Sequence, residues 1–358
     1  MGPPVTPVNW WHVRWLHEVL DPCSLLAARS ADRVQALAAQ LDGLPTQIAD
    51  VSKPETVRAL VERGDVLIST VGPFARFGEP AVQAAIAAGA IYIDSTGEPS
   101  FIRRIFEKHH HAAMAARTPL LTAFGYDWVP GNLAAALALK EAGEAATRVA
   151  VGYFSRGGGG ISGGTRASMV DVMLQPSYVY RGGKLVAERS TARTRAFELI
   201  PGKSSFGVAV GASEQFALPA IHPSLLDVQV FLGMGGAKRM PWVSGFVNAL
   251  AGIPGVRAAL RSIAGHVVEG STGGPEDSDR ARSSSTILAE TFSASGQKLT
   301  RVKLEGVNGY TFTAEIIAWG AMTALGQEVM GAGALGPVSA FGLAQLELGV
   351  REAGIRRV

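Results

Sequence analysis

The sequence has almost no cysteine and comparatively few charged side chains. Cys23 is the only cysteine among 358 residues, which excludes an internal disulfide and fits a reducing compartment, so we expect a cytoplasmic protein. Charged residues make up 18% of the chain, and its net charge of +3 comes from scattered lysines and arginines without a basic stripe. Such a distribution argues against nucleic acid as a partner. With 47% apolar residues, the chain is long enough for two domains with real cores.

Signals for membrane insertion and metal binding are also missing. Residues 329–346 carry no charge, but glycines and a proline interrupt them, so we expect no membrane span. The first residues hold no continuous apolar segment of the kind found in secretory signals. The sequence contains neither a C-x-x-C nor an H-x-x-x-H pattern, and we therefore predict no metal site.

The stretch from residue 65 to residue 127 alternates between strands and helices. Strands are predicted over residues 65–71, 91–95 and 119–124, and helices over residues 79–88 and 100–116. Short links between such elements indicate right-handed crossovers on a parallel sheet. The first of these strands is apolar without alternation, which predicts burial on both of its faces. Ligands of such sheets bind beyond the carboxyl ends of the strands.

The preceding residues fit the same pattern. Strands are predicted over residues 24–30 and 46–50, with helices over residues 32–41, capped by Ser30, and after a capping box at residues 52–55. Together they look like strands two to six of a doubly wound dinucleotide-binding domain. Arg29 ends the first of these strands, where such a domain meets the adenosine ribose. An arginine at this place favours the 2′-phosphate of NADP, although a solvated arginine at a strand end is the simpler interpretation.

Beyond residue 131 the pattern changes to one typical of antiparallel strands. Residues 178–186 predict a hairpin that turns at Gly182 and Gly183. Further strands are predicted over residues 149–154, 206–210, 227–232, 285–292, 299–304 and 310–313, and closing helices over residues 316–325 and 341–353. The fold class is therefore α/β, with a Rossmann-like parallel-sheet domain followed by an α+β domain whose sheet is mixed or antiparallel.

Several short motifs together resemble one known family. They are Leu-Ala-Ala-Arg-Ser at residues 26–30, Ser-Thr-Val-Gly-Pro-Phe at 69–74, Tyr-Ile-Asp-Ser-Thr-Gly-Glu at 92–98, Gly-Tyr-Asp-Trp-Val-Pro-Gly-Asn-Leu at 125–133, Gly-Gly-Thr-Arg-Ala-Ser at 163–168, Tyr-Thr-Phe-Thr-Ala-Glu at 310–315 and Gly-Ala-Leu-Gly-Pro at 333–337. The chain is thereby similar to the saccharopine dehydrogenase-like reductases, which include the trans-acting enoyl reductases.

The resemblance implies an oxidoreductase with NADP as its cofactor. It implies hydride transfer to or from a C=N, C=C or amine carbon of a small-molecule or lipid-like substrate, and contacts of a homodimer. We accordingly divide the chain into an atypical segment at residues 1–23, an NADP-binding domain at 24–130, a substrate and dimerisation domain at 131–330, and a C-terminal helical segment at 331–358 that packs back on the first domain.

The first residues depart from the family pattern. A dinucleotide fold opens with a strand, a glycine-rich turn and a helix, but no glycine lies between Gly2 and Gly43. Two explanations compete. Either the reading frame or start of the chain is displaced, so that residues 1–23 replace that unit, or the protein has lost its phosphate cradle. In the second case it would be a non-catalytic binding or assembly protein.

The candidate site residues lie at the predicted strand ends and in one glycine-rich loop. For the cofactor they are Arg29, Ser30, Asp50, Thr70, Val71, Gly72, Pro73, Phe74, Ser95, Thr96 and Gly97; for catalysis Asp127 and Tyr126; for the substrate Asn132, Gly163, Gly164 and Thr165. A carboxylate at Asp127 could orient a substrate amine or transfer a proton, or it could be the N-cap of the next helix. Glu98 could line the nicotinamide pocket or cap a helix that begins near Ser100. The loop could bind an anion or act as a lid or linker.

Overall fold

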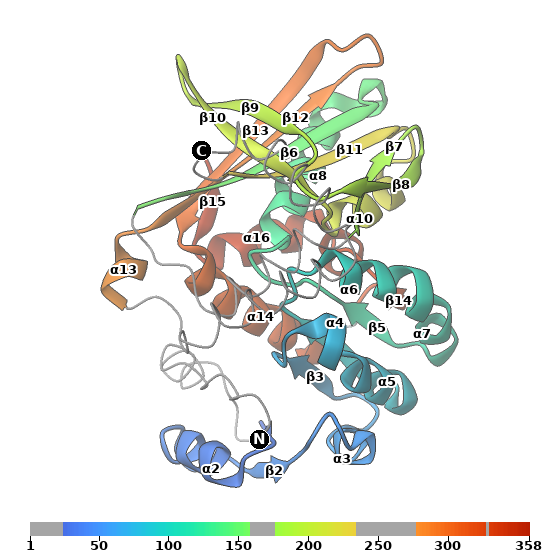
Figure 1. Cartoon of the computed structure of the whole chain (residues 1–358), viewed down its shortest axis with the longest axis vertical. Coiled ribbons are helices and arrows are strands. Elements are labelled where there is room, and N and C mark those ends of the chain that lie inside the picture. Colours follow the sequence, from blue (N-terminus) through green and yellow to red (C-terminus); the bar gives the residue numbers. More distant parts are fainter. Residues whose placement is uncertain (1–23, 158–175, 234–276, 327–328) are drawn as a thin grey trace, which may run out of the picture.

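The computed structural model describes residues 24–157, 176–233, 277–326 and 329–358. A parallel sheet and a larger mixed sheet enclose a layer of helices, and a separate two-stranded unit lies beside the parallel sheet (Figure 1). This arrangement confirms the predicted fold class. None of the helices in these described ranges is long and apolar enough to cross a bilayer.

The parallel sheet carries most of the strand ends predicted to form the site. In spatial order its strands are β14 (Gly333–Ala334), β5 (Pro119–Leu121), β4 (Ile91–Asp94) and β3 (Val66–Ser69). They are joined by helices α4 (Phe74–Phe77), α5 (Glu79–Ala88), α6 (Pro99–Arg104), the π-helical segment η1 (Ile105–His109) and α7 (His110–Ala116). Pro80 lies in the first turn of α5 and Gly89 ends that helix in the left-handed conformation, as predicted.

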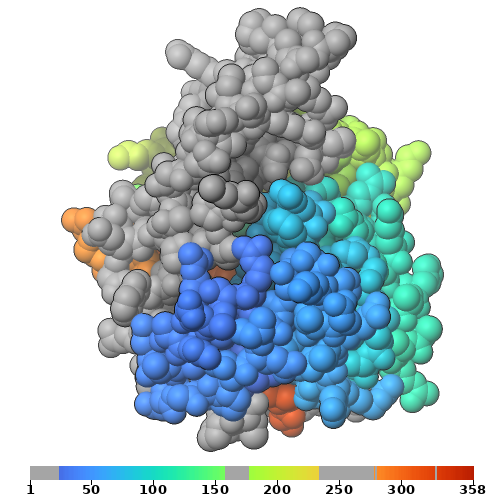
Figure 2. Space-filling view, turned by 60° about the horizontal axis from the view of Figure 1, so that its bottom comes forward, coloured from blue at the N-terminus to red at the C-terminus, as the bar shows by residue number. Residues whose placement is uncertain are grey.

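The first described elements form their own unit at the bottom of Figure 1. It consists of β1 (Leu26–Ala28), α2 (Ala31–Ala39), β2 (Thr46–Ile48) and α3 (Pro54–Arg58), and β1 pairs with β2 in parallel. Figure 2 shows its surface, in dark blue, beside the lighter blue surface of the residues that follow. The predicted capping box is wrong, because α3 has Lys53 at its N-cap position and Ser52 instead donates from its N–H and its hydroxyl to Asp50 Oδ1.

The strand β3 is not buried on both faces, and that prediction is wrong. Ile68 is 38% exposed and Val71 45% exposed. Within the described parts of the chain β3 pairs with β4 alone, so it is an edge strand, and β1 and β2 belong to a separate sheet. A doubly wound sheet would place one further strand between β1 and β3. Within β3 itself, Ile68 is the exposed apolar side chain.

The larger sheet is mixed. Its strands, in spatial order, are β15 (Ile355–Arg357), β13 (Lys298–Val307), β12 (Ser284–Phe292), β6 (Arg148–Arg156), β11 (Asp227–Gly233), β10 (Lys203–Val210) and β9 (Thr194–Ile200). Strands β6 and β11 are parallel, and the other neighbours are antiparallel. The hairpin of β7 (Pro176–Arg181) and β8 (Lys184–Arg189) joins beside β11 and turns at Gly182 and Gly183, both with positive φ, as predicted. Strands β9 and β15 were not predicted from the sequence.

Helices between the two sheets build the main core. They are α8 (Val129–Ala142), α10 (Glu214–Ile221), α14 (Gly309–Gly326), α15 (Pro337–Phe341) and α16 (Leu343–Glu352). The exposed turn η2 (Gly143–Ala145) follows α8, and α13 (Asp277–Ala281) lies outside this layer (Figure 1). Helix α8 packs on β6, β12 and β13, α14 packs on β3 and β4, and α16 contacts both helices. The core therefore connects the parallel sheet to the mixed sheet.

The strand predicted over residues 310–313 is wrong, because these residues open helix α14. Asn308 Oδ1 accepts the backbone N–H groups of Tyr310 and Thr311, each at 3.0 Å. An asparagine that satisfies free N–H groups in this way starts a helix. This local signal outweighed the β-branched and aromatic residues that predicted a strand.

Some predictions fall on parts of the chain outside the described ranges. They concern residues 1–23, the loop with Gly163, Gly164 and Thr165, the helix after it, and the helices expected over residues 242–266. The domain boundaries also stay predictions. In the C-terminal segment, β14 extends the parallel sheet by pairing with β5, whereas β15 pairs with β13 of the mixed sheet.

Candidate active site

The carboxyl ends of β3 and β4 lie next to each other. The pairing of Ser69 with Asp94 ends this part of the ladder, so residues 70–74 and 95–97 leave the sheet side by side. Thr70, Val71, Gly72 and Pro73 are exposed, Ser95 and Gly97 are half-buried, and Phe74 and Thr96 are buried in the fold. Open backbone at the carboxyl edge of a parallel sheet is where such folds bind ligands.

The buried carboxyl of Asp94 ties the ends of β4 and β5 together. Its Oδ1 accepts the backbone N–H groups of Thr96 and Ala123, both at 2.9 Å. Burial raises the pKa of Asp94 to about 6, although these hydrogen bonds act in the opposite direction. Asp94 therefore holds the segments that follow β4 and β5 in place next to each other.

Glu98 links the two strand ends by capping a helix. Its Oε1 accepts the N–H of Phe74 at 2.7 Å, and its Oε2 accepts the N–H of Ala75 at 2.9 Å. Glu98 occupies the N-cap position of α6, but its side chain caps α4 instead. A carboxylate at the free N–H groups of a helix is stabilised by both hydrogen bonds and the helix dipole. Glu98 thus holds residues 70–74 against the end of β4.

Asp127 lies at the opening of this edge. The segment that follows β5 brings its half-buried carboxylate over Gly97, where a Cβ atom would be only 2.9 Å from Asp127 Oδ2. Asp127 forms no hydrogen bond with the residues described, and burial raises its pKa to about 6. Trp128 occupies the N-cap position of α8, so the structure does not show Asp127 as a helix cap. The peptide bonds Gly72–Pro73 and Asp127–Trp128 are both cis.

Tyr126 and Asn132 flank Asp127 but point into the protein. The Tyr126 N–H donates to Thr313 Oγ1 at 2.9 Å, and its ring packs edge-on against Tyr153 and Phe312. Burial raises the pKa of Tyr126 to about 12, against the smaller opposite effect of the neighbouring Ser285 and Ser155 side chains. The Asn132 side chain is fully buried and donates to the Trp128 carbonyl and to Ser213 Oγ, each at 3.0 Å.

The residues expected at the adenosine end lie in the separate two-stranded unit. Arg29 follows β1 and is exposed, and no described residue forms a hydrogen bond or ion pair with it. Asp50 follows β2, and hydrogen bonds from the backbone and hydroxyl of Ser52, aided by the charges of Arg29 and Lys53, lower the pKa of Asp50. Ser30 occupies the N-cap position of α2 but makes no side-chain hydrogen bond there.

Comparisons with known proteins identify the family. A sequence profile of the saccharopine dehydrogenase NADP binding domain matches residues 17–121. A Mycobacterium tuberculosis protein with the provisional name of trans-acting enoyl reductase is 30% identical, over 90% of this chain and 87% of its own length. The chain belongs to the saccharopine dehydrogenase-like oxidoreductase family.

Other members of the family support the same placement. A trans-acting enoyl reductase of Mycobacterium leprae is 27% identical over 90% of this chain and 87% of its own length. The fold of apo saccharopine dehydrogenase from Saccharomyces cerevisiae covers 98% of each chain with a TM-score of 0.58 at 14% identity. That structural likeness shows that the two chains share a fold.

The residues present fit the two ends of NADP. The guanidinium of Arg29, which is exposed and whose charge also acts on the Asp50 carboxylate, suits a 2′-phosphate. Residues 70–73 offer open backbone at the nicotinamide side. No described residue supplies a glycine-rich turn between them for the pyrophosphate. The described residues therefore offer candidate contacts for the two ends of a dinucleotide.

Two buried residues near the site were not found from the sequence. Tyr153 on β6 and Glu214 at the start of α10 approach within 2.6 Å, between the Tyr153 hydroxyl and Glu214 Oε1. Both side chains are buried. An acidic residue in the first turn of a helix ordinarily suggests an exposed charge near the helix dipole, so the sequence held no signal for its burial.

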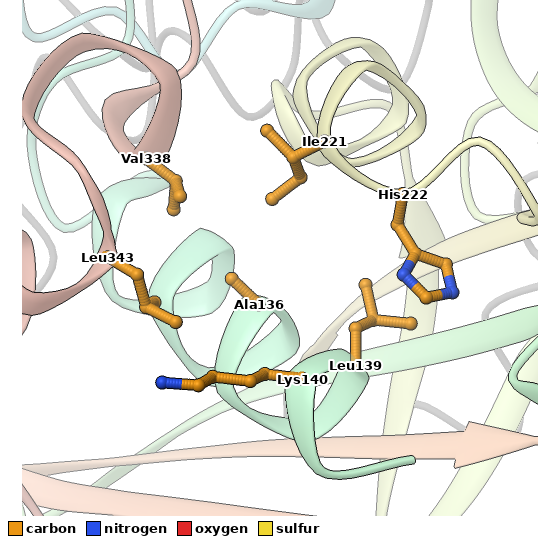
Figure 3. A pocket seen from close by; sticks show the side chains of 7 residues that line it. All are labelled: Ala136, Leu139, Lys140, Ile221, His222, Val338 and Leu343. Atoms are coloured by element: carbon orange, nitrogen blue, oxygen red, sulfur yellow. The ribbon is translucent and has the colours of Figure 1, made fainter. Parts of the chain in front are cut away.

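A small cavity of about 190 Å³ lies away from this edge (Figure 3). It is lined by Ala136, Leu139, Lys140, Ile221, His222, Val338 and Leu343. Asp127 precedes the first turn of α8, whereas Leu139 is some 10 residues into it, about 15 Å further along the axis. The cavity is therefore distinct from the strand-end site. Within the described residues, no three His, Cys, Asp or Glu side chains gather as metal ligands would.

Proposed function

We propose that this protein is an NADP(H)-dependent oxidoreductase that reduces or oxidises a C=N, C=C or amine carbon of a small or lipid-like substrate. The observation that carries the proposal is the Asp127 carboxyl, which lies beside Gly97 at the ligand edge without a hydrogen-bond partner among the described residues. Membership in the family supports the cofactor, and the names of the mycobacterial relatives support an enoyl, lipid-like substrate.

In this proposal the strand ends bind the cofactor and Asp127 transfers a proton to or from the substrate. Arg29 would bind the 2′-phosphate, and residues 70–73 with 95–97 would line the nicotinamide ribose. Bound NADPH would supply the hydride. Asp127 would donate the proton that completes a reduction, or accept it in the reverse direction. Because burial raises the pKa of Asp127 to about 6, the carboxyl can both hold and release a proton near neutral pH.

NADPH oxidation in the presence of a 2-enoyl thioester tests this role. Reduction requires protonated Asp127, whose fraction falls as pH rises through about 6, so the rate should fall over the same range. Asp127→Asn should reduce kcat by about 10²-fold or more. Asp65→Asn, an exposed acid at the opposite end of β3, is the matched control and should keep the wild-type rate. A pH-independent rate, or an active Asp127→Asn, would contradict the assignment.

A second candidate function has its own support. Among the described residues, neither β1 nor β2 pairs with β3, and no glycine-rich phosphate turn lies between the two sheets. These observations favour a non-catalytic binding or assembly protein with the shell of a reductase. Such a protein would neither bind NADPH saturably nor oxidise it. The homodimer that the family suggests can be checked by analytical ultracentrifugation of the same preparation.

A further inference from the structure

A buried polar cluster lies directly behind Asp127. The carbonyl oxygen of Trp128 has three potential donors: the N–H of Asn132 at 3.2 Å, the Asn132 Nδ2 at 3.0 Å and the Tyr153 hydroxyl at 3.1 Å. The same hydroxyl lies 2.6 Å from Glu214 Oε1. Asn132 and Glu214 are fully buried, and Tyr153 is nearly so. The cluster joins β6 and α10 of the second domain to the strand end that carries Asp127.

The number of protons in this cluster bears on whether Glu214 is ionised or protonated. A phenol has one proton, but the Tyr153 hydroxyl lies between two oxygens, Glu214 Oε1 and the Trp128 carbonyl. If Glu214 were ionised, both neighbours would only accept, and Tyr153 could donate to just one of them, so its other close contact would not be a hydrogen bond. If Glu214 is protonated, it donates to Tyr153, and Tyr153 donates to Trp128. Every close contact is then a hydrogen bond.

The surroundings of Glu214 support the neutral acid. No described lysine or arginine forms an ion pair with it, and an unpaired buried charge is costly. The two side chains also pack tightly on helix α8, since a Cβ atom at Gly131 would lie 2.0 Å from the Tyr153 hydroxyl and 2.5 Å from Glu214 Oε1. Burial raises the pKa of Glu214 to about 8 and the pKa of Tyr153 well above its usual range.

The cluster holds the residue next to Asp127 from one side, and a backbone bond holds it from the other. The Trp128 N–H donates to the Ala123 carbonyl at 2.9 Å, while its own carbonyl accepts the donors described above. Asp127 is covalently bound to Trp128 and lies against Gly97 without a hydrogen bond of its own to described residues. The position of its carboxyl therefore depends on how firmly Trp128 is held.

We propose that Glu214 is a protonated acid that acts through Tyr153 and the Trp128 carbonyl as a positioning residue for Asp127. On loss of the Glu214 proton, Tyr153 donates to the new carboxylate, and the Trp128 carbonyl loses one of its donors. The titratable groups that face Glu214 are Tyr153 on β6, Tyr178 on β7 and Asp127 before α8. The inference rests on the proposed function only for the chemical role of Asp127.

Carbon-13 NMR of the aspartate carboxyl groups in the full-length protein tests the proposal without cofactor or substrate. Asp127→Asn assigns the Asp127 signal. In the wild type we expect this signal to titrate at about pH 6 and to move a second time as Glu214 loses its proton at about pH 8. Glu214→Gln should keep the first step and abolish the second, because its amide donates to Tyr153 at every pH.

Tyr153→Phe separates positioning from a direct charge effect. A through-space effect of the Glu214 charge would persist in this variant, whereas positioning through the hydroxyl would abolish the second step. Tyr178→Phe is the matched control, since it removes a buried hydroxyl that donates to the Ala212 carbonyl at 3.0 Å, and it should keep both steps. A second step of full size in Tyr153→Phe would overturn the proposal.

Even if Tyr153→Phe does not fold, the wild type and Glu214→Gln can still overturn the proposal. An identical second step in both proteins, or its absence from the wild type, would overturn the proposal. Since no NADPH is present in these titrations, a failure of the proposed function would show separately, as an absence of cofactor binding.

Discussion

Replacing Glu214 by glutamine should stabilise the protein, and increasingly so as pH rises. The glutamine amide keeps the hydrogen bond to Tyr153 and cannot ionise. In the wild type, the pKa of Glu214 rises from 4.5 to about 8 on folding, so between these values the folded protein binds more protons than the unfolded chain. The contribution of Glu214 to the free energy of unfolding is therefore complete below pH 4.5 and is progressively lost as pH rises to about 8.

The expected size follows from the cost of a pKa shift, about 1.4 kcal/mol per unit. The difference in unfolding free energy between Glu214→Gln and the wild type should grow by about 3 kcal/mol from pH 5 to pH 7. Asp94 and Asp127, whose pKa values are also raised to about 6, titrate in both proteins and cancel in the difference.

Urea unfolding at a series of pH values measures this difference directly. Glu188→Gln is a suitable control, since Glu188 forms ion pairs with Arg181 and Arg193 and its carboxylate is stabilised by charge. Its removal should weaken the protein at neutral pH. A difference for Glu214→Gln that stays constant between pH 5 and pH 8 would show that Glu214 is ionised in the folded protein, which contradicts a protonated Glu214.

Three further predictions concern the edge of the site. Arg29→Asp should weaken NADPH binding and leave NADH binding nearly unchanged, while Arg351→Asp, the same charge change on α16, should alter neither; equal losses for both cofactors would rule out Arg29 as the phosphate ligand. Glu98→Gln should destabilise the protein by about 1–3 kcal/mol in urea unfolding, because one of the two α4 N–H groups loses its acceptor. Gly131→Ala should destabilise it strongly, since the new methyl overlaps Tyr153 and Glu214, whereas Gly326→Ala, which meets open space at the end of α14, should not; similar midpoints would contradict the described packing.

Features determined by local chemistry could be predicted from the sequence. Pro80 marks the start of α5, because a first helical turn tolerates a residue without an N–H. Gly89 ends α5, and Gly182 with Gly183 form the hairpin turn, because glycine readily adopts the left-handed backbone found at these positions. The alternation of strands and helices over residues 65–127 was predictable for the same reason. The fold class followed from it.

Features that depend on distant partners could not be predicted in this way. The apolar run of β3 indicated a strand, but its exposure depends on whether strands pair with it on one side or on both. The contact of Tyr153 with Glu214 joins residues 61 positions apart, and neither has a distinctive neighbourhood in the sequence. Asp127 could be proposed from its place after a strand, whereas its position over Gly97 depends on tertiary packing.

Titration of the full chain with NADPH, followed by the fluorescence of the nicotinamide, tests whether the protein binds this cofactor. We expect saturable binding in the micromolar range, tighter for NADPH than for NADH, with residues 70–73 and Arg29 at the two ends of the cofactor. Absence of saturable binding would contradict the assignment as an NADP(H)-dependent oxidoreductase and would support the non-catalytic alternative.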